Sequence, residues 1–192
     1  MADVEVTSRT VDGAEYPAVG TYDIDVSHTQ LGFAVRHMAV SKVRGRFSTF
    51  EGTLELAENP VDSKVSLTID AGSVDTRDEN RDNHLRTNDF FDVPNHPTWT
   101  FVSTEIKPDG PTEWKVVGDL TIRGVTKSVT LDVTLEGVVQ DPYDNHRVGF
   151  SGSTTINRED FDVAFGAVME AGGLVVAKKV DIEIELEAVR RP

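Results

Sequence analysis

The sequence has no cysteine among its 192 residues, which excludes disulfide bonds, thiolate metal sites and cysteine nucleophiles. It also lacks a long apolar run, since none approaches the roughly 20 residues that a helix needs to cross a bilayer. Hydrophobic residues still make up 38% and charged residues 27% of the chain, a balance typical of globular domains. We therefore expect a soluble folded protein without a membrane span.

Basic residues are scarce. The chain has 19 Lys and Arg against 33 Asp and Glu, a formal net charge of -14. A potential of this sign repels phosphate backbones, so nucleic acid is not an expected partner. The charge is explained by solubility or, alternatively, by steering of a cationic partner.

Residues 1–18 are expected to form a polar N-terminal arm, in which Val4 and Val6 suggest a short edge strand. The first residues include acids and show no cationic segment followed by an apolar one, which a secretory signal requires. The expected location is the cytoplasm, or outside it if a signal has been removed.

Alternation of apolar and polar residues is the strongest pattern in the chain. In residues 180–187, Val180, Ile182, Ile184 and Leu186 alternate with four acidic residues, as on a strand with one buried and one wet face. Similar rows occur at residues 22–26, 31–37, 54–56, 65–69, 114–122, 131–135 and 150–156. About eight antiparallel strands must close into a barrel or stack as two sheets, and residues 19–190 are expected to form a single domain.

Gly118 interrupts one of these apolar rows. A small residue in a barrel wall can leave space in the lumen, whereas a glycine in a strand also marks a bulge or a tight bend. Alternation alone does not decide between a hollow and a filled barrel.

About two dozen residues between the strands near Ser73 and Thr98 do not alternate and are too many for a hairpin loop. Residues 78–90 are expected to contain a short helix, because 80–87 has no Pro, Gly or β-branched residue before Thr87. Leu85 and the aromatic pair at 90–91 would anchor this insertion as a lid or plug on one barrel mouth.

The insertion also invites a chemical interpretation, because Asp82 and His84 lie two residues apart. Residues two apart on a helix face different directions, so Asp82 is poorly placed to orient His84 as a general base. Capping and surface ion pairing are the alternatives. The five histidines are scattered without zinc-ligand spacing, so neither a metal site nor catalytic residues are predicted.

His37 ends the row formed by Leu31, Phe33 and Val35. If that row faces inward, His37 is a polar group at the inner end of an apolar surface. It is then either a core histidine bonded to backbone or a contact for the polar end of a ligand.

Four separate stretches carry a family resemblance. They are YDIDVSHTQLGFAVRHMAVSKVRGRFSTFEGTL, SVDTRDENRDNHLRTNDFFDVPNHPTWTF, GDLTIRGVTKSVTLDV and GFSGSTTINREDFDV, at residues 22–54, 73–101, 118–133 and 149–163. In this order they resemble the YceI-like family of polyisoprenoid-binding proteins. Thr29 stands where the family usually has Ser and keeps the hydroxyl.

The resemblance implies an all-β fold, an eight-stranded antiparallel lipocalin-like β-barrel with a helical insertion at about 78–90. It further implies a carrier that holds a long-chain isoprenoid, isoprenoid quinone or similar lipid in its lumen, without another cofactor. Within the matching blocks, the residues whose alternation points them into the barrel are expected to bind the ligand. They are Phe33, Val35, His37, Trp99, Phe101, Leu120, Ile122, Leu131 and Val133. Arg81, His84, Leu85 and Phe90 are assigned to the lid or mouth.

Two alternatives stay open beside the expected carrier with its hydrophobic small-molecule ligand. One is an enzyme that acts on a lipid or quinone through His37 or the Asp82 and His84 region. The other is a filled barrel that serves as a protein-interaction module. Exposed strand edges or the lid are compatible with a homodimer.

Overall fold

The computed structural model of the chain describes residues 8–11, 13–166 and 175–192. These residues are mostly β-strands, with one α-helix, α1 (Glu79–Arg86), and three 3-10 turns among them, η1 (Pro60–Asp62), η2 (Ala71–Ser73) and η3 (Arg158–Phe161). The strands are β1 (Ser8–Val11), β2 (Ala14–Pro17), β3 (Gly20–Ile24), β4 (Gln30–His37), β5 (Ser41–Phe47), β6 (Phe50–Leu56), β7 (Lys64–Asp70), β8 (Val74–Asp75), β9 (Thr98–Pro108), β10 (Glu113–Ile122), β11 (Val125–Gln140), β12 (His146–Asn157) and β13 (Val176–Arg190).

The sheet closes into a barrel through β13. One edge of β13 pairs with β12, and the other pairs with β3 near its C-terminal end and with β4 along the rest. β3 and β4 therefore act as two halves of one long strand, as do β5 with β6 and β7 with β8. Counted in this way, the barrel has eight antiparallel strands, as the sequence predicts.

The expected alternation of faces is present along β13. Val180, Ile182, Ile184 and Leu186 line the barrel interior, and the acidic side chains between them point outward. Much of the negative charge therefore lies on the exterior.

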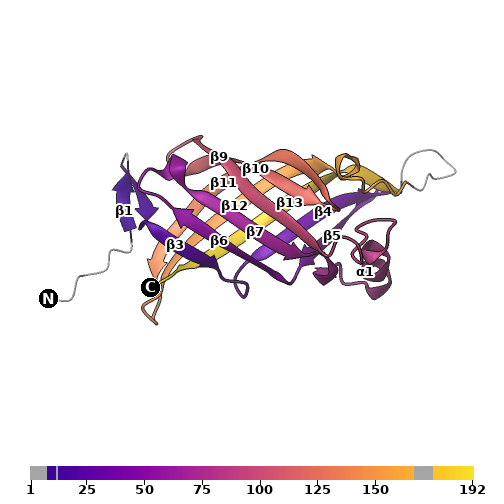
Figure 1. Cartoon of the computed structure of the whole chain (residues 1–192), viewed down its shortest axis with the longest axis horizontal. Coiled ribbons are helices and arrows are strands. Elements are labelled where there is room, and N and C mark those ends of the chain that lie inside the picture. Colours follow the sequence, from indigo (N-terminus) through magenta and orange to yellow (C-terminus); the bar gives the residue numbers. More distant parts are fainter. Residues whose placement is uncertain (1–7, 12, 167–174) are drawn as a thin grey trace.

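The N-terminal residues differ from the polar arm that composition suggests. β1 and β2 form a hairpin that caps the end of the barrel opposite α1 (Figure 1). Tyr16 is buried there, its ring meets Trp114 edge to face at 5.8 Å, and its hydroxyl donates to the Pro111 carbonyl at 2.9 Å. The hairpin therefore packs on the barrel through Tyr16. The edge strand expected around Val4 and Val6 lies outside the described residues.

The helical insertion has nearly the expected place. Asp78 caps α1 by accepting a hydrogen bond from the Arg81 backbone N–H, and the helix ends at Arg86. Phe90 and Phe91 follow it and are buried in the core. The aromatic pair therefore fastens a helix that has little apolar surface of its own.

Candidate functional site

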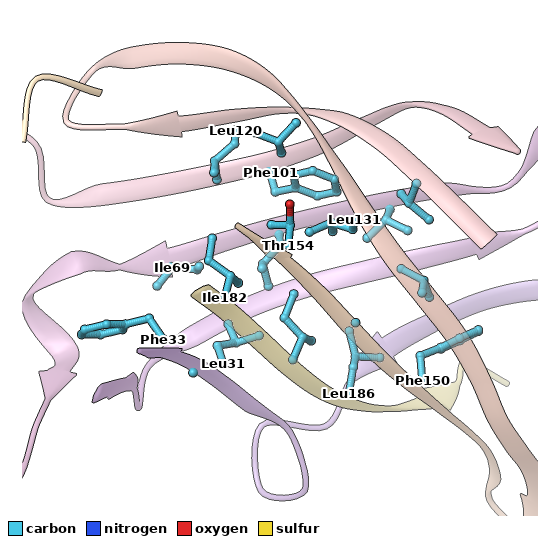
Figure 2. A pocket seen from close by; sticks show the side chains of 18 of the residues that line it. Leu31, Phe33, Ile69, Phe101, Leu120, Leu131, Phe150, Thr154, Ile182 and Leu186 are labelled. Carbon is cyan, nitrogen blue, oxygen red and sulfur yellow. The ribbon is translucent and has the colours of Figure 1, made fainter. Parts of the chain in front are cut away.

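The barrel is hollow. A cavity of about 290 Å³ lies inside it, with a wall formed almost entirely by apolar side chains from all the barrel strands. Figure 2 shows Phe101, Leu131 and Ile182 extending from different strands towards this common space. A concave apolar space of this kind is typical of a site for a hydrophobic ligand.

Eight of the nine residues that the sequence assigns to the ligand lie in the cavity wall. They are Phe33, Val35, Trp99, Phe101, Leu120, Ile122, Leu131 and Val133. They come from β4, β9, β10 and β11, so the fold brings together side chains that are about 100 residues apart in sequence.

His37 is the exception and does not line the cavity. It is the last residue of β4, opposite Ser41, and the chain then turns through Met38 and Ala39 with φ angles of 51° and 58°. The inward row therefore ends at Val35. Among the described residues the imidazole has no hydrogen-bond partner.

The four lid residues divide into two pairs. Leu85 and Phe90 lie in the cavity wall, whereas Arg81 and His84 lie outside it. Arg81 donates to the hydroxyl and carbonyl oxygens of Thr76 at 2.7 and 2.9 Å. These bonds attach the helix to the end of β8.

Asp82 and His84 do not form a catalytic pair. The Asp82 carboxylate is buried and accepts hydrogen bonds from the Thr76 N–H and hydroxyl at 2.9 and 2.5 Å. His84 instead pairs with Asp89 at 2.9 Å, and its ring packs edge to face on Phe90. Neither group faces the other, as the helical spacing predicts.

Gly118 is explained by both a bulge and a close packing contact. The pairing of β10 with β9 shifts register between Val117 and Gly118, which confirms the bulge. A Cβ atom at Gly118 would lie 2.4 Å from the Phe101 ring, so the ring has its place only because residue 118 has no side chain. Gly45 accommodates Phe33 in the same way, with the ring 2.3 Å from a Cβ. The two glycines thus give room to two large rings of the cavity wall.

Two arginines are the charged residues of the cavity wall within the described part of the chain, which contributes no Asp or Glu to it. Arg9 lies at the hairpin end and donates to the carbonyls of Pro17, Ala57 and Glu58. Arg158 lies towards the α1 end and is buried.

The Arg158 guanidinium donates to the carbonyls of Val163, Val176 and Ala177 and has no ion pair with a described carboxylate. Burial lowers the pKa of Arg158, with the neighbouring Glu159 acting in the opposite direction. Sequence reasoning missed this residue, although extension of the inward row through Thr154 and Ile156 places it in the lumen.

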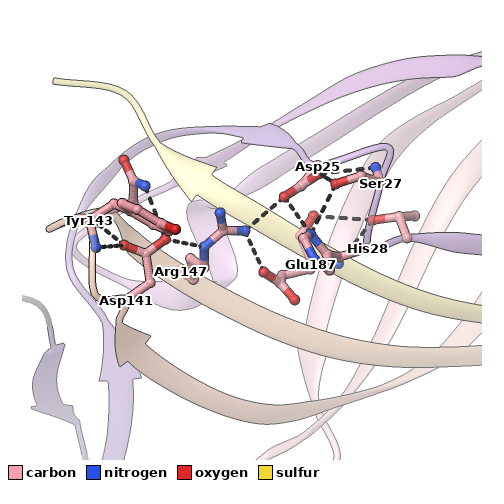
Figure 3. Close-up of polar contacts among 9 residues, drawn as sticks. Asp25, Ser27, His28, Asp141, Tyr143, Arg147 and Glu187 are labelled. Atoms are coloured by element: carbon pink, nitrogen blue, oxygen red, sulfur yellow. Dashed lines mark hydrogen bonds and ion pairs between the residues drawn. The ribbon is translucent and has the colours of Figure 1, made fainter.

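A polar cluster lies outside the cavity and is centred on Arg147 (Figure 3). Its Nη1 atom lies 2.7 Å from Asp25 and 2.5 Å from Glu187, and its Nε atom lies 2.6 Å from Asp141. The bond to Asp141, followed by those to Asp25 and Glu187, raises the pKa of Arg147. The same guanidinium, with Asn145, lowers the pKa of Asp141.

Asp25 is subject to opposing effects in this cluster. Burial raises its pKa, but hydrogen bonds from Ser27, Arg147 and His28 outweigh burial and hold the pKa well below its ordinary value. Asp25, His28 and Glu187 have ligand atoms within 4.8 Å of one another, a spacing compatible with a metal ion. Arg147 already supplies a positive charge between two of these groups, so the cluster is best explained as an ion-pair network that joins β3, β12 and β13.

Comparison with known proteins gives a consistent assignment. A family described as YceI-like domain matches residues 22–188. A UPF0312 protein of Staphylococcus epidermidis is 40% identical over 168 residues, which cover 86% of this chain and 95% of that protein. A UPF0312 protein of Pectobacterium atrosepticum is 38% identical over 180 residues, 93% of this chain and 90% of the relative.

Solved structures show the same fold. The crystal structure of Burkholderia cenocepacia BcnA is similar with a TM-score of 0.75 and 27% identity, covering 85% of this chain and 98% of that one. A polyisoprenoid binding domain from Saccharophagus degradans, implicated in plant cell wall breakdown, has a TM-score of 0.68 at 16% identity and covers 91% of this chain and all of its own. In the described part of the chain, α1 is too short and too polar to traverse a bilayer.

Proposed function

Because the chain belongs to the YceI-like domain family, we propose that it is a binding protein that holds the apolar chain of an isoprenoid, or of a similar long lipid, in the barrel lumen. The observation that carries this proposal is the apolar cavity, to which the described residues contribute no carboxylate. The polyisoprenoid binding domain of Saccharophagus degradans shares this architecture and supports the class of ligand only through the fold.

Burial of the ligand supplies enough free energy without an ion pair. Each buried CH₂ contributes about 0.8 kcal/mol, so a five-carbon isoprene unit contributes up to roughly 4 kcal/mol before ordering costs. Three or four units then suffice for about micromolar binding or tighter. Affinity is thus expected to follow chain length and not head-group charge.

The polar end of the ligand is assigned to the α1 end, beside Arg158. Its buried guanidinium has no ion pair in the described residues, and it prefers an oxygen acceptor such as a quinone carbonyl or a phosphate. Catalysis is not part of the proposal, because Asp82 and His84 bind separate partners outside the cavity wall.

The decisive experiment is native mass spectrometry of freshly purified protein, with mass spectrometry of its organic extract. The lumen-filling variant is Gly152→Trp. Gly152 lines the cavity opposite Val133 and Ile184, and a Cβ there meets its nearest neighbour at an ordinary 3.6 Å. The matched control is Val102→Trp on the exterior, where the side chain is 51% exposed.

We expect a stoichiometric lipid adduct on the parent and on Val102→Trp, and its loss from a folded Gly152→Trp. An adduct that persists in Gly152→Trp would show that the lipid is held elsewhere. A parent that carries no lipid and acquires none from quinones or polyprenols would refute the proposal. Circular dichroism checks that each variant is folded. Thr154→Phe, at another position of the cavity wall, is a second lumen-filling variant.

A further inference from the structure

The β4–β5 hairpin has a charge opposite to that of the whole chain. From Ser27 to Phe50 the sequence contains no Asp or Glu, although acids outnumber bases 33 to 19 overall. In the same segment the hairpin carries Arg36, Lys42, Arg44 and Arg46. The net charge of -14 therefore does not describe this surface.

The tip of the hairpin is apolar and exposed. Val40 is 85% and Met38 is 42% exposed, and both lie in the tight turn between β4 and β5. The turn is fixed by a hydrogen bond from the Val40 N–H to the His37 carbonyl, and the Met38 N–H donates to the carbonyl of Val175. Large apolar side chains in a fixed turn, exposed to water, indicate a contact surface.

The basic residues gather on the outer face behind this tip. In the register of the hairpin Arg36 lies directly opposite Lys42, and Arg44 lies opposite Ala34. Like charges that face each other across strands destabilise the pair unless an anion binds to them. Asp181 provides one such partner, since it binds Lys42 at 2.9 Å.

Arg46 is also paired, with Asp75 at 3.1 Å, but the other two cations of the hairpin have no acidic partner within the described part of the chain. Among the described residues, Arg36 and Arg44 form no ion pair, although Asp181 lies close enough to Arg36 to be influenced by it. Two more exposed lysines, Lys178 and Lys179, lie on the adjacent part of β13, and Lys178 pairs with Glu159. An external anionic surface would complement the remaining cations.

We propose that the β4–β5 hairpin docks on an anionic lipid bilayer, with Met38 and Val40 at the acyl boundary and Arg36 and Arg44 on the head groups. Apolar residues backed by cations are typical of interfacial membrane contacts. This inference rests on the proposed function, which gives the protein a reason to bind a membrane. Val35, which lines the cavity, lies three residues before Met38, so the docked tip would bring the lumen close to its lipid source.

The test is sedimentation of the full chain with vesicles of phosphatidylcholine, with and without phosphatidylglycerol. We expect binding that requires phosphatidylglycerol and weakens as salt rises from roughly 0.1 M to 0.5 M. Arg36→Gln with Arg44→Gln should weaken it by roughly five-fold per charge, about 25-fold together. Met38→Ser with Val40→Ser should also reduce binding, whereas Val139→Ser with Tyr143→Ser, two exposed residues at the opposite end, should not.

Absence of binding, equal binding to both kinds of vesicle, or undiminished binding of the two hairpin variants would overturn the inference. A second measurement, loading of the protein with a polyprenol in vesicle-free solution, distinguishes a failure of docking from a failure of the proposed function. A parent that loads but ignores vesicles refutes docking alone. A parent that binds vesicles but never loads refutes the proposed cargo and leaves the docking surface intact.

Discussion

Both ends of the barrel contain buried aromatic rings, but they differ in how many arginine side chains bond to backbone carbonyls. At the hairpin end, burial of Tyr16 against Trp114 dominates, with Arg9 bonded to carbonyls beside it. At the α1 end, the buried Phe91 ring packs on Phe47 and Trp99, and four arginine side chains bond to backbone carbonyls. Arg86 donates to Gly72 and Val74, and Arg123 donates to Phe90 and Asp162, in addition to the bonds of Arg81 and Arg158.

This difference has consequences for motion. Burial of a large aromatic ring contributes several kcal/mol, whereas one net hydrogen bond contributes about 1 kcal/mol and is readily replaced by water. The helix α1 buries little apolar surface of its own and depends on such hydrogen bonds outside its Phe90–Phe91 anchor, so we expect local opening there, at the end that also carries Arg158 and the β4–β5 tip. Under the proposed function, ligand exchange is then expected at the α1 end.

The largest effect is expected from Tyr16→Ala. Loss of a buried ring together with its hydroxyl bond to Pro111 should cost about 3 kcal/mol in the free energy of unfolding. For a chain of this size the melting temperature should fall by roughly 6–12 °C. Tyr143→Ala is the control, since Tyr143 is 84% exposed and should change little. Similar small shifts in both variants, measured by calorimetry, would mean that the hairpin does not stabilise the barrel.

A smaller and local effect is expected from Asp82→Ala. The change leaves the Thr76 N–H without its partner in a buried position, at a cost of about 1–3 kcal/mol. Hydrogen exchange should accelerate in α1 and the residues that follow it, with the barrel strands unaffected. Glu79→Ala, at an exposed position of the same helix, is the control. If protection falls equally along β9 to β13, the α1 end is not an independent unit.

Much of the barrel and its lumen could be predicted from the sequence because alternation on strands is a local property. Alternation with polar neighbours predicts that Leu131 and Val133 point into the lumen, and it predicts the same for Leu120 and Ile122. All four lie in the cavity wall. The same alternation places His37 in the inward row, but this last residue of β4 lies beyond the cavity wall, just before the chain turns through Met38 and Ala39. Composition could not show where that change of backbone occurs.

Contacts between distant segments could not be predicted. Asp25 and Arg147 are 122 residues apart, and only the closed barrel brings them within 2.7 Å. The β1–β2 hairpin was missed because its polar composition hides Tyr16, whose contacts lie far along the chain at Pro111 and Trp114. Whether the barrel is hollow depends on how rings pack, as Phe101 does over Gly118, and alternation carries no information on that.

The smallest effect is expected from Arg147→Gln, which removes the main ionic contact near the hairpin end. The pKa values of Asp25 and Asp141 are lowered in the folded state, so these groups contribute stability above their ordinary pKa near 4, and the contribution is lost as pH falls below it. The melting temperature should decrease by roughly 2–4 °C at pH 7, because these side chains are partly hydrated.

As pH falls from about 4 towards the lowered pKa values of the folded state, the melting curves of Arg147→Gln and the parent should approach each other, because the carboxyl groups protonate first in the unfolded chain and later in the folded one. Arg191→Gln breaks the exposed pair with Asp23 near the same end and serves as the control, with a smaller shift at pH 7. A difference between parent and Arg147→Gln that is constant from pH 7 to pH 2 would mean that Arg147 acts through packing. The hairpin end would then depend on packing and on the Arg9 hydrogen bonds, and not on ion pairs.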